Sequence, residues 1–152
     1  MPIETTLSIQ IAAPPERVVA LYLDVAHWHE LFPATIRAAR IVRSSPEEVE
    51  IEVDHLEGKV PNFLRQKSPT EIELDEHKRL FRATFSNRFE PHEGGTRYTL
   101  VAHVQLIGWA RLLTPFVGPV VRSRMRRFVL EPMKAAAERP TNGDATGPCV
   151  SR

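Results

Sequence analysis

The feature that most constrains the fold of this chain is the apolar periodicity of its last long segment, residues 109–139. Apolar side chains recur there at the three- and four-residue intervals of a single helix face, at Val117, Val121, Met125, Phe128 and Val129. A helix of this length gains most of its stability by packing its apolar face against other elements. The rest of the chain must therefore supply an apolar surface for this helix to cover.

Prolines and glycines predict where the helix begins and where it is interrupted. Gly118-Pro119 suits its start, because a proline in the first helical turn loses no internal hydrogen bond. Pro132 removes one backbone hydrogen bond inside the segment, which predicts a kink between Phe128 and Pro132. Beyond Arg139 the composition becomes polar and rich in glycine and proline. Residues 1–139 are therefore predicted to form one domain, and residues 140–152 a disordered tail.

Seven segments upstream of this helix have the composition and alternation of β-strands. The clearest is Val49–His55, in which Val, Ile and His alternate with acidic residues, as in a strand with one wetted face. Pro61 predicts that its strand lies at an edge or contains a bulge, and Pro91–Gly95 predicts a hairpin turn. The seven predicted strands are Ile3–Ala12, Thr35–Arg43, Val49–His55, Val60–Lys67, Glu71–Asp75, Leu80–Phe89 and Thr96–Ile107.

Two short helices are expected between the first and second strands, at Val18–Leu23 and Val25–Leu31, with Asp24 as the N-cap of the second. The predicted order is then strand, two short helices, six antiparallel strands and a long helix. An apolar sheet face and one remaining amphipathic helix must bury each other. The sequence thus predicts an α+β fold in which a curved seven-stranded antiparallel sheet wraps the C-terminal helix and leaves a cavity between them.

Composition restricts the classes of function. The 152 residues carry a formal net charge of +1, so the chain as a whole shows no attraction to nucleic acid, and no nucleic-acid partner is expected. No stretch approaches the ~18 consecutive apolar residues of a membrane span, and the single cysteine, Cys149, allows no intrachain disulfide. These features favour a soluble cytoplasmic protein that does not insert into membranes.

Three local stretches resemble a known family. Ile9–Val18 is similar to a first strand that runs into an Ala-Pro-Pro-Glu turn, and Leu23–Trp28, followed by Phe32-Pro33, is similar to an Asp-x-x-x-Trp motif. Gly94–Thr99 is similar to a Gly-Gly-Thr-Arg turn before the last strand. Together they resemble the START-like or Bet v 1-like (SRPBCC) superfamily, in particular its polyketide cyclase/dehydrase-type branch. The resemblance covers residues 3–138 and implies the helix-grip fold, on which carriers and enzymes both occur.

Candidate ligand-binding residues follow from the inward side of the predicted elements. His55 continues the inward alternation of its strand and could orient a ligand or act as a general base; the alternative is a strand-end histidine that reaches solvent or satisfies one backbone carbonyl. Arg124 shares the apolar helix face and could pair with an acidic ligand group or extend past the helix edge. The predicted ligand-binding residues are Trp28, His55, Phe85, Asn87, Tyr98, Arg124 and Phe128, and the catalytic candidates are His55 and Tyr98.

Metal and cofactor sites are not expected. His27 and His29 are two residues apart on a short helix, so their rings should point in different directions, with no acidic third ligand nearby. No phosphate-binding glycine loop or nucleophile motif is present in the sequence.

Three hypotheses remain. The first is a module that binds a lipid, isoprenoid or polyketide-like molecule in the predicted cavity. The second is a polyketide cyclase or dehydratase that uses one acid or base in that cavity. The third is an interaction protein that uses the arginine-bearing face of the C-terminal helix and the acidic face of the third strand.

Overall fold

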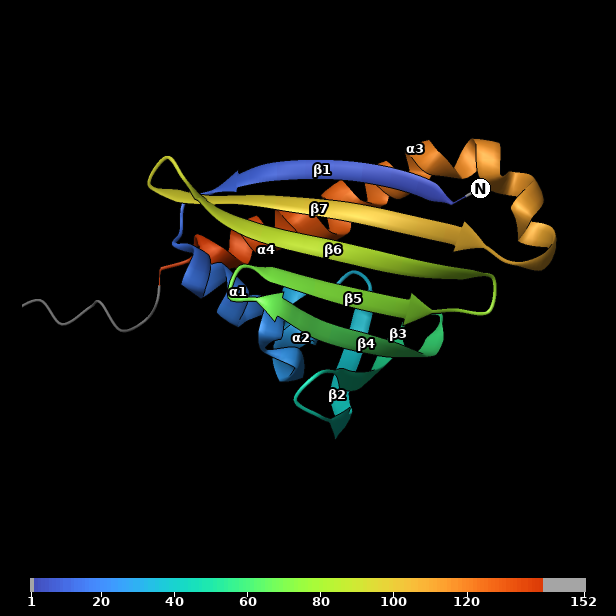
Figure 1. Ribbon diagram of the computed structural model, residues 1–152, viewed down its shortest axis with the longest axis horizontal. Coiled ribbons are helices and arrows are strands. Elements are labelled where there is room, and N and C mark those ends of the chain that lie inside the picture. Colours follow the sequence, from blue (N-terminus) through green and yellow to red (C-terminus); the bar gives the residue numbers. More distant parts are fainter. Residues whose placement is uncertain (1, 141–152) are drawn as a thin grey trace, which may run out of the picture.

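The computed structural model describes residues 2–140, which form a single antiparallel sheet and two groups of helices (Figure 1). The seven strands lie in the order β1-β7-β6-β5-β4-β3-β2, so every neighbouring pair except β1 and β7 is consecutive in sequence. Their bounds are β1 Ile3–Ile11, β2 Ile36–Ser44, β3 Val49–His55, β4 Gly58–Ser68, β5 Glu71–His77, β6 Phe81–His92 and β7 Gly95–Leu106.

The helices lie before β2 and after β7. The first group consists of α1 (Pro15–Leu23), the 3-10 turn η1 (Val25–His27) and α2 (Trp28–Leu31). The second consists of η2 (Gly108–Leu113), α3 (Thr114–Met125), the π-helical turn η3 (Arg126–Leu130) and α4 (Glu131–Ala137). Both groups lie on the same side of the sheet (Figure 1). The predicted helix-grip architecture, with seven antiparallel strands, two short helices after the first strand and a long C-terminal helix, is confirmed.

The core lies between the sheet and the end of the C-terminal helix. Strand alternation points Ile51, Val53 and Ile72 inward, and each has no exposed surface. Leu130 and Met133 are buried completely where α4 packs against α1 and β1. This part of the C-terminal helix therefore anchors it to the sheet. No residue of α3, in contrast, is fully buried.

The C-terminal helix begins earlier than predicted. Gly118-Pro119 does not start it: α3 begins at Thr114, Pro115 occupies the first turn, and Pro119 lies inside the helix. Pro115 meets the same requirement as Pro119 would, because the first-turn amides have no internal partner. The interruption expected from Pro132 takes the form of η3, the π-helical turn directly before α4. Pro132 has no N–H for the carbonyl four residues earlier, so the regular pattern changes there.

Three local predictions need correction. β4 is an interior strand, although Pro61 predicted an edge or a bulge; its register irregularity lies between Gln66 and Ser68, away from Pro61. Pro61 pairs with Glu52 of β3 and precedes the part of β4 that pairs with β5, which begins at Asn62. The second short helix is divided into η1 and α2. The Asp24 carboxylate does not cap the backbone but accepts a 2.8 Å hydrogen bond from Nδ1 of His27. The predicted tail beyond Pro140, including Cys149, lies outside the described residues.

Candidate functional site

A pocket of about 330 Å³ lies between the inner face of the sheet, the α2 region and the C-terminal helix. It exists where α3 and η3 cover the sheet without filling the space beneath them. Most of its wall is apolar or aromatic, including Trp28, Phe32, Leu74, Phe81, Phe85, Leu100, Val104, Leu106, Val117, Val121, Met125, Phe128 and Val129. All five residues of the periodic helix face on which the fold prediction depended line this pocket.

Six of the seven predicted ligand-binding residues are in the pocket wall. They come from four different parts of the fold, namely α2, β3, β6 and the C-terminal helix, and they are Trp28, His55, Phe85, Asn87, Arg124 and Phe128. Tyr98 is the exception. These positions make the six side chains accessible to a pocket occupant, and their roles in binding stay predictions.

Tyr98 lies in the core, so the prediction that it presents its hydroxyl to a pocket is wrong. Its ring is completely buried and stacks on Phe89 with the ring centroids 4.7 Å apart. The hydroxyl donates a hydrogen bond to Oδ1 of Asn87, and burial raises the Tyr98 pKa well above its ordinary value. A hydroxyl that is bonded and hard to ionise is not available as an acid or base for a ligand.

Asn87 joins Tyr98 to Tyr22 at the inner end of the pocket. Its amide nitrogen donates to the Tyr22 hydroxyl at 3.1 Å and to the carbonyl oxygen of Ile72 at 3.2 Å. The amide of Asn87 therefore has hydrogen-bond partners within the protein itself. Tyr22 was not identified from the sequence, because its position in a short helix gives no alternation signal.

Trp28 closes one side of the pocket. Its indole nitrogen donates a 2.8 Å hydrogen bond to the backbone carbonyl of Tyr22. Its ring packs edge-on against Tyr22 and Phe32, with centroid distances of 5.9 and 6.3 Å. Because both the polar and the apolar parts of the indole are held, Trp28 is a fixed wall.

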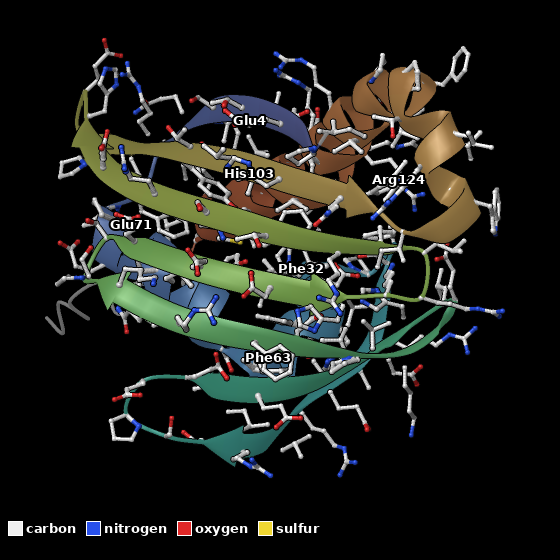
Figure 2. The ribbon with its side chains drawn as sticks, turned by 45° about the vertical axis from the view of Figure 1, so that its right-hand side comes forward. Glu4, Phe32, Phe63, Glu71, His103 and Arg124 are labelled. Carbon is white, nitrogen blue, oxygen red and sulfur yellow. The ribbon has the colours of Figure 1, made fainter. Side chains whose placement is uncertain are left out.

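Arg124 lies at the rim, on α3 near the end of β7 (Figure 2). It lines the pocket and is also exposed to solvent. This position is compatible both with pairing to an acidic ligand group and with extension past the helix edge, the two interpretations drawn from the sequence. Its guanidinium carbon lies 5.7 Å from the centroid of the Phe128 ring, within the range of a cation–π contact. Within residues 2–140 it forms no ion pair shorter than 4.0 Å.

Four polar or charged side chains gather at another part of the wall: His55 of β3, Asn62 of β4, Glu76 of β5, and Lys78 just beyond β5. Nε2 of His55 lies 3.5 Å from Oε1 of Glu76, and Nζ of Lys78 lies 3.2 Å from the same oxygen. Burial lowers the pKa of His55. The negative charge of Glu76 opposes part of this decrease, and the positive charge of Lys78 adds to it. His55 is thus favoured in its neutral form inside the pocket. Its side chain is only 13% exposed, so the solvent-facing alternative does not hold, whereas a hydrogen bond to the backbone of Thr35, which also acts to raise its pKa, agrees with the alternative of a backbone partner.

Asn62 and Glu76 were missed in the sequence, although a signal was present. Asn62 alternates inward with Leu64, and Glu76 alternates inward with Ile72 and Leu74. The predicted fifth strand ended at Asp75, one residue too early to include Glu76. Continuing the inward alternation to the end of each observed strand would have identified both.

Residues 2–140 contain no group of three or more His, Cys, Asp or Glu side chains that could hold a metal ion. The rings of His27 and His29 do not diverge as predicted but stack at a centroid distance of 6.5 Å. The change from a 3-10 turn to an α-helix between them alters the simple helical rotation on which the prediction depended. None of the helices in this part of the chain is both long enough and apolar enough to cross a bilayer.

Comparison with models of known protein families assigns this chain to a family. A family model described as "Polyketide cyclase / dehydrase and lipid transport" matches residues 2–138. The chain belongs to this family. The resemblance carried by the three sequence motifs is therefore confirmed, and the match covers nearly all of the residues that the structure describes. Among curated proteins, no sequence matches this member of the cyclase/dehydrase family.

Solved structures show the same fold. A Thermus thermophilus protein, TTHA0849, is 19% identical, with a TM-score of 0.72 over 90% of this chain and 99% of that one. The Zhui aromatase/cyclase from a Streptomyces species is 14% identical, with a TM-score of 0.68 over 91% and 95% of the two chains. A START superfamily protein from Mycobacterium smegmatis is 14% identical, with a TM-score of 0.67 over 89% and 97%.

The length of another structural neighbour differs. The di-domain ARO/CYC protein BexL has a TM-score of 0.72 and 19% identity over 92% of this chain. This chain spans only 51% of the length of BexL. At these identities the neighbours establish the helix-grip fold and leave the ligand to be argued from the pocket.

Proposed function

We propose that this protein binds a hydrophobic or amphipathic small molecule in the pocket between the sheet and the C-terminal helix. The observation that carries the proposal is the pocket itself, a space of about 330 Å³ with a predominantly apolar and aromatic wall. Burying the apolar surface of a ligand there removes it from water without displacing protein groups from their own contacts. Membership in a family described by cyclase, dehydrase and lipid-transport activities supports the same conclusion.

The volume limits the size of the ligand. At the packing density of protein interiors, about 0.75, a pocket of 330 Å³ holds roughly 250 Å³ of ligand atoms. This suits a compact ring system or a short isoprenoid and is too small for a complete two-chain lipid. Among the three ligand classes considered from the sequence, polyketide-like aromatics and isoprenoids fit best.

Turnover by a cyclase or dehydratase mechanism is the second candidate, and His55 is the observation that favours it. Its imidazole lines a largely apolar pocket and lies 3.5 Å from the Glu76 carboxylate, an arrangement that suits a general base. A neutral His55 could accept a proton from a ligand carbon or hydroxyl, and Glu76 would stabilise the imidazolium that forms. Tyr98 has no part in this candidate, because its hydroxyl is bonded to Asn87 in the core.

Filling the pocket tests the proposal. Val121 of α3 lines the pocket, whereas the nearby Ser123 is exposed and outside it. Binding of 8-anilinonaphthalene-1-sulfonate, followed by its fluorescence, is expected to weaken at least tenfold in Val121→Trp and to stay unchanged in Ser123→Trp. Native mass spectrometry of the freshly purified protein would show whether it carries a ligand from the cell. Equal binding by both variants would place the probe outside the pocket and contradict the proposal.

Turnover is tested separately. His55→Ala is expected to abolish cyclisation or dehydration of a linear polyketide mimic if the protein is an enzyme, with little loss of ligand affinity. Unchanged turnover in an active preparation of His55→Ala would remove the enzymatic candidate and leave the binding function in place.

A further inference from the structure

Three buried polar atoms of the pocket have no hydrogen-bond partner within the described residues. They are Nε2 of His55, Oδ1 of Asn62 and Oε1 of Glu76. Lys78 lies 3.2 Å from Glu76 Oε1 but is not aligned for a hydrogen bond to it. Leaving a buried polar atom without a partner is costly, so such atoms are rare in native proteins and point to a role. Among the side chains of residues 2–140, these three atoms are the complete set, and all three belong to one pocket.

Strand register brings two of the three residues together, and a side-chain contact adds the third. Asn62 of β4 is directly opposite Glu76 of β5, and β3 adds His55 from the other side of β4. His55 and Glu76 reach toward each other over β4, to within 3.5 Å. All three side chains are almost fully buried, with Asn62 only 3% exposed. The group, which we call the polar end of the pocket, is therefore fixed by the sheet.

The chemistry of the polar end is that of a hydrogen-bond acceptor. A carboxylate oxygen and an amide oxygen can only accept. The neutral imidazole of His55 offers either a lone pair or one N–H at Nε2. A ligand carboxylate, ketone or ether brings only further acceptors and cannot satisfy Asn62 and Glu76. A hydroxyl group can donate to Glu76 and accept from His55 at the same time.

We propose that the polar end selects ligands that carry a phenolic or alcoholic hydroxyl group, which donates its hydrogen to Glu76 or Asn62 while the rest of the molecule occupies the apolar part of the pocket. This inference rests on the proposed binding function and adds the chemical class of the ligand. Glu76 and Asn62 act as specificity-determining residues, because their oxygens would stay unpaired beside any ligand without a donor.

A pair of nearly isosteric probes tests this directly. 2-Naphthol and 2-methylnaphthalene differ by one hydroxyl in place of a methyl group. By titration calorimetry, the protein is expected to bind 2-naphthol at least tenfold more tightly than 2-methylnaphthalene, and 2-naphthoate more weakly than either. In Glu76→Met the preference for 2-naphthol is expected to fall below threefold, while 2-methylnaphthalene binds as well as before. Glu71→Gln, on the outer face of the same strand, should retain the full preference.

The outcomes separate the two proposals. If both probes bind with equal affinity, the pocket binds small molecules but the polar end does not select a hydroxyl, and this inference is overturned alone. If neither probe binds, both proposals are overturned.

An independent observation concerns the outer surface of η2 and α3. Five large apolar side chains are exposed there within a short segment, with Leu112 81% and Phe116 73% exposed. We call them the apolar ridge: Trp109, Leu112, Leu113, Phe116 and Val120. Figure 2 shows side chains of this region projecting away from the sheet. An exposed cluster of this kind marks a contact surface.

The charged residues in the chain segment that carries the apolar ridge are all positive. No Asp or Glu occurs between Glu93 and Glu131, whereas residues 108–130 contain five exposed arginines, Arg111, Arg122, Arg124, Arg126 and Arg127. None of the five forms an ion pair within 4.0 Å in residues 2–140. A second copy of the chain docked through the same surface would bring these arginines together. An anionic lipid surface would neutralise them and accept the apolar side chains at once.

We infer that the apolar ridge and its arginines dock on the surface of a bilayer that contains anionic lipids. Val120 belongs both to the ridge and to the pocket wall, and Arg124 stands at the pocket rim, so docking would bring the pocket opening to the lipid surface. An apolar ligand could then pass between bilayer and pocket without crossing water. Tryptophan and arginine are the residue types expected at the boundary between headgroups and acyl chains.

Vesicle sedimentation tests this surface. The protein is expected to bind phosphatidylcholine vesicles that contain 30% phosphatidylglycerol at least tenfold more tightly than pure phosphatidylcholine vesicles, and less tightly at 0.5 M salt. The double variant Leu112→Asp with Phe116→Asp should lose most of this binding. Ile41→Asp, at an exposed apolar residue of β2 outside the ridge, should retain it. The inference would be overturned if the protein bound neither kind of vesicle. It would also be overturned if the protein formed dimers that the double substitution dissociates.

Discussion

Tyr98 donates its hydroxyl hydrogen to Oδ1 of Asn87 at 2.5 Å, at a place where neither residue has exposed surface. Asn87 also donates to Tyr22, so one amide satisfies two buried hydroxyls from different elements. Asn87 reaches the pocket wall as well, which makes it the boundary between solid core and ligand space. Several consequences of this division between core and pocket can be measured.

Replacing Asn87 by leucine is expected to destabilise the protein by about 2–4 kcal/mol, because the Tyr22 and Tyr98 hydroxyls both lose a buried partner. The free energy of unfolding in urea gives the value. In Tyr98→Phe only one side of the network is removed, so its loss should be smaller, at about 1–2 kcal/mol. A neutral Asn87→Leu would mean that the hydroxyls find other partners.

Two phenylalanines distinguish core from pocket wall. Phe89 has no exposed surface and packs on Tyr98 and Tyr22, so Phe89→Ala is expected to cost about 3–5 kcal/mol. Phe128 faces the pocket and is half-buried, so Phe128→Ala should cost less than about 2 kcal/mol and weaken ligand binding. Denaturant unfolding with ligand titration checks both. Equal losses would show that η3, which carries Phe128, packs on a filled interior.

Gly95 and Gly118 differ in how much space surrounds the position of an added Cβ atom. A Cβ on Gly95 would lie 2.2 Å from the carbonyl oxygen of Ile11, so Gly95→Ala must push β1 and β7 apart and is expected to cost about 1–3 kcal/mol. At Gly118 the nearest atom to a new Cβ is 3.9 Å away, and alanine is the better helix former. Gly118→Ala should therefore stabilise the protein by about 0.5–1 kcal/mol. Thermal unfolding of both variants provides the comparison.

Stability is expected to fall as pH drops below about 6.5, the ordinary histidine pKa, through His55. Burial lowers the pKa of native His55, so the unfolded chain binds the proton more tightly and gains stability relative to the native state in acid. Glu76 and Glu57 oppose this shift and Lys78 reinforces it. His27 acts in the opposite direction, because its bond to Asp24 raises its pKa.

The difference between wild type and His55→Gln isolates this contribution. Urea unfolding between pH 5 and 8 should show the wild type losing stability relative to His55→Gln below pH 6.5, with parallel curves above it. A difference that grows on the alkaline side would mean that native His55 holds its proton more tightly than the unfolded chain.

Arg65 joins three carboxylates on the outer face of the sheet. It donates to Glu48 at 2.8 Å and to Glu73 at 2.6 Å, and it also pairs with Asp75. Arg65→Met would leave Glu48 and Asp75 without a cation and Glu73 with only Lys67, 3.9 Å away, and is expected to cost about 1–3 kcal/mol in low salt. High salt should reduce the loss by screening their repulsion.

Arg40→Met is the control for Arg65, because Arg40 makes one exposed ion pair, with Glu52, and little change is expected there. If Arg65→Met were as mild as Arg40→Met, Glu48 and the two carboxylates of β5 would have to separate freely in the folded sheet. Circular dichroism in urea, with and without salt, measures both variants.

The order of the elements, the seven strands and the helix that covers them could be predicted from residue patterns alone. Alternation along a strand and the three-to-four spacing of Val117, Val121 and Met125 are local properties, because side-chain direction follows directly from backbone geometry. The same rule placed His55 and Asn87 on the inner face. It failed for Tyr98, since inward direction does not distinguish a pocket wall from a solid core.

Only the tertiary structure decided which inward residues share a space. Asn62 and Glu76 meet because β4 and β5 pair in one register, and His55 joins them only because the sheet curves. The pocket left beneath α3 and η3, and the complete burial of Leu130 and Met133 farther along the same helix, depend on the volumes of many distant side chains acting together. Such packing is a long-range property, and no local pattern in the chain encodes it.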